Sequence, residues 1–422
     1  MDELAERLHI TGGARLTGSV RINGAKNAIL PLLAGTLLSE RRVLLEEVPS
    51  LNDVQTMKEA LESLGVKVDW TGDTMEIDPM GLRSLEMPPS LTRRMRASNL
   101  VMGPLLGRCG RFKVSYPGGC TIGSRPMDLH LKGFRALGAV IGDDHGSVTA
   151  EAAGLKGADI HLDFPSVGAT ENIMMAAALA QGTTIIRNAA REPEIVELQN
   201  FLNKLGARIR GAGLDTIRID GVKKLEQEVS HRVIPDRIET GTFMAAAAIT
   251  RGEVMITNAI PEHVEAIIAK LREAGVSIRE EADRIIVAAP SQWKAVDIRT
   301  MPFSGFPTDM QPQMMVFLSL AQGTSIITEN IFENRFRHVG ELRRMGAQVH
   351  LQGRSAVITG VPHLTGTMVQ ATDLRAGAAL VLGGLAAENT TTIDGVEHLD
   401  RGYEKLDSRL KMLGARISRE SD

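Results

Sequence analysis

The chain has 422 residues, enough for two or three domains that each bury a full core. Its hydrophobic content of 43% is ordinary for a globular protein, and its net charge of −3 argues against nucleic acid as the main partner. Two cysteines are too few for a disulfide framework and fit a reducing compartment. Because no signal peptide is visible and no apolar run approaches the roughly 20 residues of a membrane span, we expect a cytoplasmic protein without a membrane partner.

A Leu-Gly-Ala-like signature recurs six times along the chain at spacings of 68 to 73 residues. Its glycines are Gly65, Gly138, Gly206, Gly275, Gly346 and Gly414. Before each glycine, an amphipathic helix such as 194–205 is expected, and each glycine would form its left-handed C-terminal cap. A short β-type run precedes each amphipathic helix. These runs are 43–45, 112–114, 184–186, 254–256, 325–327 and 391–393.

A second helix precedes each β-type run, and it is apolar on nearly all sides. The expected ranges are 26–38, 94–106, 170–180, 240–249, 309–320 and 373–386. A helix without a polar face is a buried helix. The α/β pattern therefore predicts two pseudo-threefold domains, each with three buried helices surrounded by sheets and outer helices. A doubly wound sheet would need longer apolar strands, and a TIM barrel would need eight units.

The buried helices are expected to begin with polar or charged residues, which symmetry would place at one end of each domain. These residues are Lys26, Asn27, Arg94, Arg96, Thr170, Glu171, Glu239, Thr240, Asp309, Asp373 and Arg375. Helix N-termini attract anions and disfavour cations. We therefore interpret Lys26, Arg96 and Arg375 as ligands of phosphate or carboxylate. Thr170, Thr240 and Asp309, each taken singly, are explained by ordinary capping. Asp309 could instead be a general base, and the sequence favours neither role.

The second unit contains an insertion bounded by Pro and Gly, 116–126, with Cys120 at its tip. Glycines would leave this thiol exposed, and the nearby Arg125 would favour the thiolate. Cys109 is interpreted as a small buried hydrophobic residue. Cys120 is therefore the candidate reactive cysteine.

These residues lie in motifs that resemble the UDP-N-acetylglucosamine 1-carboxyvinyltransferase family over nearly the full length. The motifs are Asn23-Gly24-Ala25-Lys26-Asn27, Pro117-Gly118-Gly119-Cys120-Thr121-Ile122-Gly123, Pro235-Asp236-Arg237-Ile238-Glu239-Thr240-Gly241-Thr242, Phe306-Pro307-Thr308-Asp309-Met310-Gln311, Phe332-Glu333-Asn334-Arg335, Asp373-Leu374-Arg375 and Arg401-Gly402-Tyr403. The resemblance implies two inside-out α/β barrel domains, each of three repeats. We expect one domain from 1–25 with 235–422, carrying Asp309 and Arg401, and another from 26–234, carrying the Cys120 loop.

The resemblance also implies transfer of the enolpyruvyl group of phosphoenolpyruvate to the 3′-hydroxyl of UDP-N-acetylglucosamine by addition and elimination, with release of phosphate. This is the first committed step of peptidoglycan synthesis, and it needs no cofactor or metal. Cys120 would protonate phosphoenolpyruvate or aid product release, and fosfomycin would alkylate it. Asp309 would deprotonate the hydroxyl, while Lys26 and Arg401 would also be catalytic.

The binding residues implied by the resemblance fall into two sets. Phosphoenolpyruvate would contact Lys26, Arg96, Cys120, Arg125, Arg335, Arg375 and Arg401, with Asp373 as a further active-site position. The UDP-sugar would contact Asn27, Arg96, Arg125, Pro126, Met127, Asp128, Leu129, Ser166, Val167, Gly168, Asp309 and Ile331. Where some members carry a lysine before the Ser-Val-Gly triplet, this chain has Phe164, which puts one diphosphate contact in question.

Two alternatives stay open at this stage. A shikimate-3-phosphate enolpyruvyl transferase would share the fold and the chemistry, although the Cys120 loop with its downstream Arg-Pro favours the UDP-sugar. A non-catalytic regulatory paralogue is disfavoured because Lys26, Cys120, Asp309 and Arg401 are all present.

Overall fold

The computed structural model describes residues 6–116 and 127–421. Cys120, Arg125 and Pro126 lie outside the described residues. Contacts divide the described chain into two compact units. Unit 1 comprises 6–23 and 235–421, and unit 2 comprises 24–116 and 127–234. The chain therefore leaves unit 1 after Asn23 and returns to it after Ile234.

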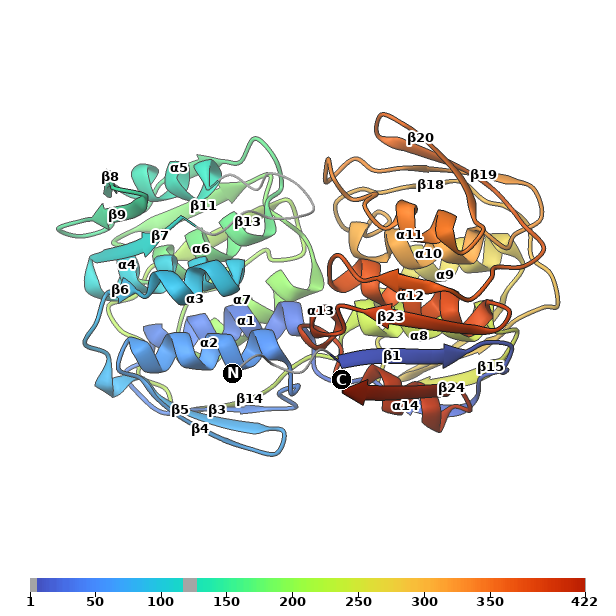
Figure 1. Cartoon of the computed structure of the whole chain (residues 1–422). Coiled ribbons are helices and arrows are strands. Elements are labelled where there is room, and N and C mark those ends of the chain that lie inside the picture. Colours follow the sequence, from blue (N-terminus) through green and yellow to red (C-terminus); the bar gives the residue numbers. More distant parts are fainter. Residues whose placement is uncertain (1–5, 117–126, 422) are drawn as a thin grey trace. The chain divides into compact units, whose positions relative to one another are not determined.

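Each unit contains three four-stranded sheets in its described part, and all six sheets share one topology (Figure 1). An outer strand pairs parallel with the strand of the β-type run, which pairs antiparallel with the third strand, and this in turn pairs antiparallel with the fourth. In unit 1 the sheets are β22-β23-β1-β24, β2-β15-β17-β16 and β18-β19-β21-β20. In unit 2 they are β14-β3-β5-β4, β6-β7-β9-β8 and β10-β11-β13-β12.

The strands are short, and their inward side chains alternate with outward ones. In unit 1 they are β1 Glu6–Thr11, β2 Thr17–Arg21, β15 Glu253–Thr257, β16 Ser277–Glu281, β17 Arg284–Ala288, β18 Ile298–Arg299, β19 Thr324–Thr328, β20 Gln348–Gln352, β21 Ser355–Thr359, β22 Met368–Gln370, β23 Thr390–Asp394 and β24 Arg416–Ser421. In unit 2 they are β3 Val43–Glu46, β4 Lys67–Thr71, β5 Thr74–Asp78, β6 Glu86–Met87, β7 Arg111–Ser115, β8 Val140–Asp144, β9 Ser147–Glu151, β10 Asp159–His161, β11 Thr183–Arg187, β12 Ile209–Arg210, β13 Thr216–Asp220 and β14 Val229–Arg232. All six β-type runs predicted from the sequence are strands.

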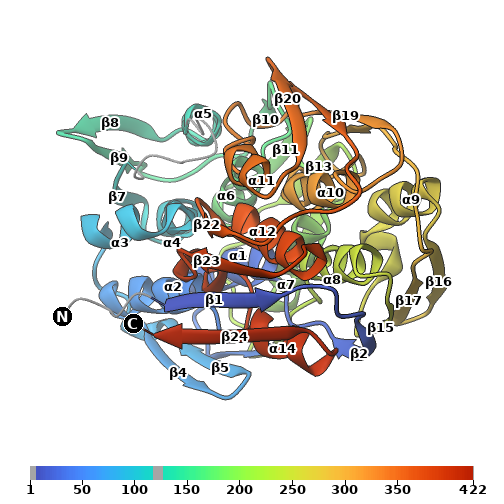
Figure 2. The same cartoon turned by 45° about the vertical axis from the view of Figure 1, so that its right-hand side comes forward.

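The central helices of each unit are buried on almost every side, as predicted. In unit 1 they are α8 Arg237–Ile249, α10 Gln311–Leu318 and α12 Leu374–Ala386, which pack on one another (Figure 2). In unit 2 they are α1 Lys26–Gly35, α4 Met102–Cys109 and α6 Val167–Ala177. Every residue of α10 is buried. These helices carry the core because an all-apolar surface is most stable away from water.

The remaining helices are amphipathic or short. The amphipathic helices are α2 Asn52–Ser63, α5 Asp128–Ala136 and α7 Pro193–Leu205 in unit 2, and α9 Glu265–Ala274, α11 Val339–Arg344 and α14 Leu406–Met412 in unit 1. The short elements are α3 Pro89–Arg94 and α13 Glu397–Asp400, with the 3₁₀ turns η1 Thr36–Leu38, η2 Pro79–Gly81, η3 Arg96–Val101, η4 Pro261–His263 and η5 Thr308–Met310. The six signature glycines all have positive φ, between 92° and 112°, at the ends of the amphipathic helices. The predicted sixfold register is therefore confirmed.

Two predicted buried helices begin later than expected. The range 94–106 is divided into α3, η3 and α4, so Arg94 ends a helix instead of beginning one. Likewise, Asp309 lies in η5, and the α-helix begins at Gln311. Each α-helix carries a proline in its first turn, Pro104 or Pro312. A proline has no N–H to donate and clashes with the carbonyl four residues before, so the α-helix cannot extend far upstream of it.

Candidate functional site

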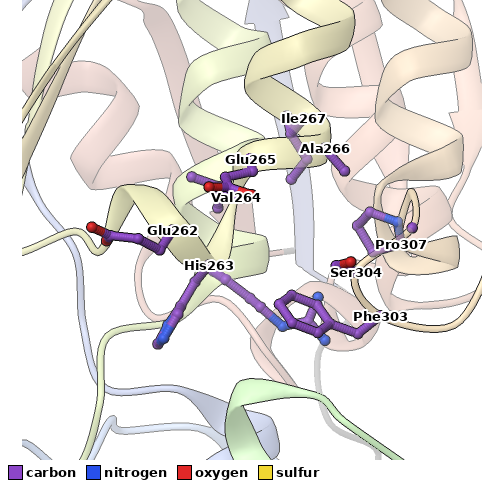
Figure 3. A pocket seen from close by; sticks show the side chains of 11 residues that line it. Glu262, His263, Val264, Glu265, Ala266, Ile267, Phe303, Ser304 and Pro307 are labelled. Carbon is purple, nitrogen blue, oxygen red and sulfur yellow. The ribbon is translucent and has the colours of Figure 1, made fainter. Parts of the chain in front are cut away.

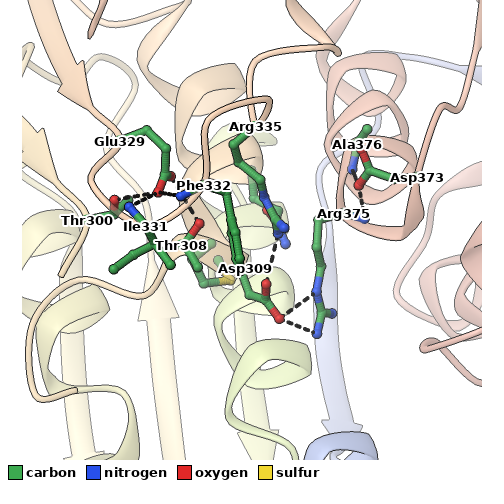
Figure 4. Close-up of polar contacts among 12 residues, drawn as sticks. Thr300, Thr308, Asp309, Glu329, Ile331, Phe332, Arg335, Asp373, Arg375 and Ala376 are labelled. Atoms are coloured by element: carbon green, nitrogen blue, oxygen red, sulfur yellow. Dashed lines mark hydrogen bonds and ion pairs between the residues drawn. The ribbon is translucent and has the colours of Figure 1, made fainter. Parts of the chain in front are cut away.

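In unit 1, the carboxylate of Asp309 lies between two buried arginines (Figure 4). Arg335 donates from Nη2 to Oδ1 at 2.8 Å, and Arg375 donates from Nη2 and Nε to Oδ2 at 3.1 and 3.3 Å. Both arginine residues are 4% exposed, whereas the Asp309 side chain is 26% exposed. We name these three residues the Asp309 cluster. It presents a partly accessible carboxylate whose orientation is fixed by two cations.

Local structure explains how these side chains meet. Asp309 is not the N-cap of η5 or of α10, which are Pro307 and Met310, so the capping interpretation is wrong. Asp373 is the N-cap of α12 and accepts hydrogen bonds from the backbone N–H groups of Arg375 and Ala376, both at 3.0 Å. This cap fixes the turn from which Arg375 extends. Burial disfavours the charged form of Arg375, but attraction to Tyr403 and Asp309 outweighs it and raises the pKa of the guanidinium.

Ile331 is held near this cluster by a buried carboxylate. Glu329, at the end of β19, accepts hydrogen bonds from the Thr300 and Thr308 hydroxyls at 2.8 and 3.0 Å (Figure 4). It also accepts the backbone N–H groups of Ile331 at 2.8 Å and Phe332 at 3.2 Å. Because Thr308 immediately precedes Asp309, Glu329 connects the loop that carries Ile331 to the turn that carries Asp309.

Several buried polar atoms beside the Asp309 cluster in sequence have no hydrogen-bond partner in the described part of the chain. They are Oε1 and Nε2 of Gln311, Oε1 of Gln313, Nε of Arg335, Nε2 of His338, Oγ1 of Thr372 and Nη1 of Arg375. An unsatisfied buried polar group costs about 1–3 kcal/mol. Such groups are rare in protein cores, and their concentration here is typical of a site built to bind a polar ligand.

In unit 2, Lys26 is the first residue of α1 and forms an ion pair with Asp53 of α2, with Nζ and Oδ2 2.6 Å apart. Both side chains are nearly buried, at 11% and 6% exposure. Gly24 allows this placement, because a Cβ at that position would lie 2.0 Å from the carbonyl oxygen of Glu47. The Lys26 ammonium lies beside a helix N-terminus, and the carboxylate of Asp53 compensates its charge there. The ammonium also adds to the attraction of the helix terminus for an anion.

The beginnings of α5 and α6 lie close together in unit 2. Met127 is the N-cap of α5, and Asp128 and Leu129 are its first residues. Ser166 is the N-cap of α6, where its Oγ accepts the N–H of Ala169 at 3.4 Å; Val167 and Gly168 follow.

Ser166 and Asp236 are therefore the caps of α6 and α8, and Thr170 and Thr240 are not. Both threonines lie one turn inside and donate their hydroxyls to the carbonyls of the cap residues at 2.8 Å.

A neutral histidine joins the beginnings of α5 and α6. Nδ1 of His130 lies 3.0 Å from Nδ2 of Asn172, whose Oδ1 accepts the N–H of Gly103. Asn172 must therefore donate to Nδ1, which leaves the proton on Nε2. Burial, with the charge of Arg96, lowers the pKa of His130 to about 4. A Cβ on Gly168 would lie 3.2 Å from Cε1 of His130, so the imidazole borders the Ser-Val-Gly segment.

A buried acidic side chain lies one turn further along α6. Glu171 is 3% exposed. Burial raises its pKa well above the ordinary value, and the charges of Glu194 and Glu192 add to the shift.

The other predicted site residues are placed as follows. Arg96 begins η3, Asn27 is the second residue of α1, and Arg401 follows α13; all three are half-buried. Phe164, two residues before Ser166, is 44% exposed. Unit 1 thus gathers Asp309, Arg335, Arg375 and the loop of Ile331, while unit 2 gathers Lys26 and, at another pair of helix starts, the segments 127–129 and 166–168.

A separate small pocket in unit 1 is lined by residues of 262–267 and 303–307 (Figure 3). It has room for about one water molecule, which is too little for a nucleotide sugar. Within the described ranges, no three His, Cys, Asp or Glu side chains are grouped so as to hold a metal ion. No described helix is long and apolar enough to span a membrane.

Four residues of these sites were given no role from the sequence. They are Asp53, His130, Glu329 and Tyr403. Tyr403 is part of a recognised motif, but the other three are single polar residues in otherwise ordinary segments. Only their contacts with Lys26, Asn172 and the Ile331 loop distinguish them.

The fold is that of an enolpyruvyl transferase. The model of the EPSP synthase (3-phosphoshikimate 1-carboxyvinyltransferase) family matches residues 10–410. UDP-N-acetylglucosamine 1-carboxyvinyltransferase 1 of Caldanaerobacter subterraneus subsp. tengcongensis is 57% identical over 96% of this chain and 97% of its own. The Carboxydothermus hydrogenoformans protein of the same name is 56% identical over 98% of both chains. The chain therefore belongs to the UDP-N-acetylglucosamine 1-carboxyvinyltransferases within this family.

Solved structures agree with this assignment at the level of fold. The enolpyruvyl transferase NikO from Streptomyces tendae matches with a TM-score of 0.89 at 27% identity, covering 99% of this chain and 100% of its own. EPSP synthase from Acinetobacter baumannii matches with a TM-score of 0.77 at 19% identity over 99% of this chain and 100% of its own. The predicted pair of inside-out α/β domains is confirmed by these neighbours.

Proposed function

We propose that the protein transfers the enolpyruvyl group of phosphoenolpyruvate to the 3′-hydroxyl of UDP-N-acetylglucosamine and releases phosphate. The sugar hydroxyl attacks C2 of phosphoenolpyruvate while C3 gains a proton, and the tetrahedral intermediate then loses phosphate. The observation that carries this proposal is the Asp309 cluster in a chain 57% identical to an enzyme named for this reaction. The product is committed to peptidoglycan synthesis.

In this proposal, Asp309 accepts the proton of the attacking hydroxyl. Arg335 and Arg375 keep it ionised and oriented, so the carboxylate is ready before the substrate binds. A carboxylate with two cationic neighbours is a weak base, and it becomes effective as bond formation acidifies the hydroxyl. The unpartnered donors of Arg335 and Arg375 supply charge for the anionic substrates. Arg401 and Asp373 belong to the same proposed set.

Lys26 and Arg96 would bind phosphoenolpyruvate from unit 2, with Arg125. Lys26 stands at a helix start, where backbone N–H groups add to its charge. The segments 127–129 and 166–168, with Asn27 and Ile331, would hold the UDP-sugar. The units would act as the two domains expected from the sequence, with boundaries near 23 and 234. We place the reaction in the cytoplasm, where both substrates are made, without metal, cofactor, nucleic acid or membrane.

A phosphate-release assay tests the reaction. Phosphoenolpyruvate with UDP-N-acetylglucosamine should release phosphate at a rate that depends on both substrates. Shikimate-3-phosphate, the acceptor of the nearest rival reaction, should not replace the sugar. If phosphoenolpyruvate releases phosphate with shikimate-3-phosphate but not with UDP-N-acetylglucosamine, the rival reaction is favoured. No phosphate release with either acceptor would favour a non-catalytic paralogue.

Fosfomycin labelling tests the assignment of the two cysteines. Cys109 ends α4 and is half-buried, and burial raises the pKa of its thiol. Less thiolate means slower alkylation. We expect Cys120→Ser to lose the covalent label, as measured by intact mass, and Cys109→Ser to keep it. A label that depends on Cys109 would refute the assignment.

A further inference from the structure

Tyr403 packs against Arg375 of the Asp309 cluster and is buried from solvent. It is 1% exposed and is among the largest fully buried side chains in the described chain. Its hydroxyl lies 2.8 Å from Oγ1 of Thr242 and accepts a hydrogen bond from Nε2 of Gln313 at 3.2 Å. Thr242 belongs to α8 and Gln313 to α10, so the phenol joins two of the three central helices of unit 1.

The third central helix contributes Arg375, whose Cζ lies 5.3 Å from the centroid of the Tyr403 ring. A guanidinium at this distance over an aromatic face is attracted by the ring, and more strongly when both groups are buried. Through Nε and Nη2, the same guanidinium donates two hydrogen bonds to Oδ2 of Asp309. Arg375 is therefore held between a ring that cannot ionise easily, because burial raises the pKa of Tyr403, and the carboxylate.

Arginine is a flexible side chain that loses much rotamer entropy when it is fixed. Two hydrogen bonds to one oxygen of a partly exposed carboxylate do not by themselves prevent other rotamers. The Tyr403 ring removes them, and the bonds to Thr242 and Gln313 fix the ring in turn. We propose that Tyr403 is a positioning residue that holds Arg375 against Asp309 and so orients the carboxylate for the reaction.

This inference rests on the proposed role of Asp309 as the proton acceptor. Because Tyr403 does not reach solvent, its loss should lower kcat more than it raises either KM. We expect Tyr403→Leu to lower kcat at least tenfold, since misplacement by about 1 Å can cost a hundredfold, with the KM for UDP-N-acetylglucosamine within about twofold of wild type. Tyr403→Phe keeps the ring and should therefore lower kcat much less than Tyr403→Leu does.

A matched control separates positioning from general loss of packing. Phe317 of α10 is 0% exposed and stacks on Trp293, away from Arg375. Phe317→Leu should lower the melting temperature as Tyr403→Leu does but leave kcat within about twofold, because it changes only packing. If Tyr403→Leu lowers kcat no more than Phe317→Leu does, the positioning role is refuted.

A double-mutant cycle keeps the inference testable if Tyr403→Leu fails to fold. Thr242→Val removes the hydroxyl that anchors Tyr403 and preserves the shape of the side chain. Tyr403→Phe and Thr242→Val should each lower kcat by about threefold, and the double variant should fall no further than the worse single variant, because both remove the Tyr403–Thr242 hydrogen bond. Losses that multiply would refute the inference.

Asp309→Asn, assayed in parallel, distinguishes the two proposals. A wild-type kcat in Asp309→Asn would overturn the role of Asp309 and the positioning role with it. A low kcat in Asp309→Asn, together with unchanged kcat in the Tyr403 variants, would overturn the positioning role alone.

Discussion

Gly24 is the first residue of unit 2, two positions before Lys26, and it lies very close to a neighbouring backbone. A Cβ built on it would lie 2.0 Å from the carbonyl oxygen of Glu47 and 3.3 Å from Cδ of Pro49. Real Cβ atoms essentially never approach closer than 3.0 Å, so Gly24→Ala must displace one of the two backbones by about 1 Å. Because Ala25 and Lys26 follow directly, the displacement should move the start of α1.

A displacement of about 1 Å at a binding group can cost a hundredfold in rate, and overpacking costs about 1–3 kcal/mol of stability. We therefore expect Gly24→Ala to lower kcat/KM for phosphoenolpyruvate about 10- to 100-fold in a protein that still melts cooperatively. The assay is phosphate release at varied phosphoenolpyruvate and saturating UDP-N-acetylglucosamine. Gly154→Ala, where a Cβ meets nothing within 4 Å in the same unit, is the matched control. A wild-type kcat/KM in Gly24→Ala would refute the reasoning.

The remaining expectations concern stability. The raised pKa of Glu171 means that the folded state binds its proton more tightly, so this residue stabilises below pH about 4.5 and costs stability as pH rises. Glu171→Gln should therefore raise the melting temperature more at pH 8 than at pH 5. His130 has the opposite linkage: with a folded pKa of about 4, it stabilises above pH 6.5 and loses that contribution as pH falls toward 4. His130→Gln should flatten that loss. Gly340, inside α11 and exposed, leaves room for a Cβ, so Gly340→Ala should gain about 0.5–1 kcal/mol.

Thermal melts across pH check all three variants, with wild type measured at each pH. An equal gain from Glu171→Gln at pH 5 and pH 8 would contradict the linkage. For His130→Gln, an unchanged slope between pH 7 and pH 4 would contradict it. A lower melting temperature in Gly340→Ala would show that the helix does not tolerate the added methyl group.

Local sequence patterns predicted much of the fold because each repeat carries its own signals for a buried helix, a strand, an amphipathic helix and a capping glycine. The glycine spacing gave the register, and the all-apolar helices identified the core. The helix starts were predicted less well. A cap can lie one turn before the expected start of a helix, as Ser166 does before Thr170, so composition alone misplaces it. Pro104 and Pro312 carried a signal for the late starts of α4 and α10, because proline restricts the preceding turn.

The candidate site could be predicted only as a set of residues. Asp309 meets Arg335 of its own repeat and Arg375 of the next repeat across 26 and 66 positions, and no local pattern encodes that pairing. The structure excludes the capping role of Asp309, because Pro307 and Met310 are the N-caps of η5 and α10. Tyr403 stood in a recognised motif, yet its contact with Arg375 depends on how α8, α10 and α12 pack. Long-range packing therefore determined the geometry, and the motifs supplied only the participants.

The strand pairing at the two chain crossings has a consequence for synthesis. Strand β2 pairs with β15 and strand β14 pairs with β3, so 24–234 is one continuous insertion within unit 1. During synthesis on the ribosome, the inserted unit can complete its three sheets before the strands that pair with residues 6–23 have been made. Asn23 and Asp236 are joined by a 2.9 Å backbone hydrogen bond. The two ends of the insertion are thus adjacent. In a chain from which 24–234 has been excised, a very short linker would be enough to join the remaining ends of unit 1.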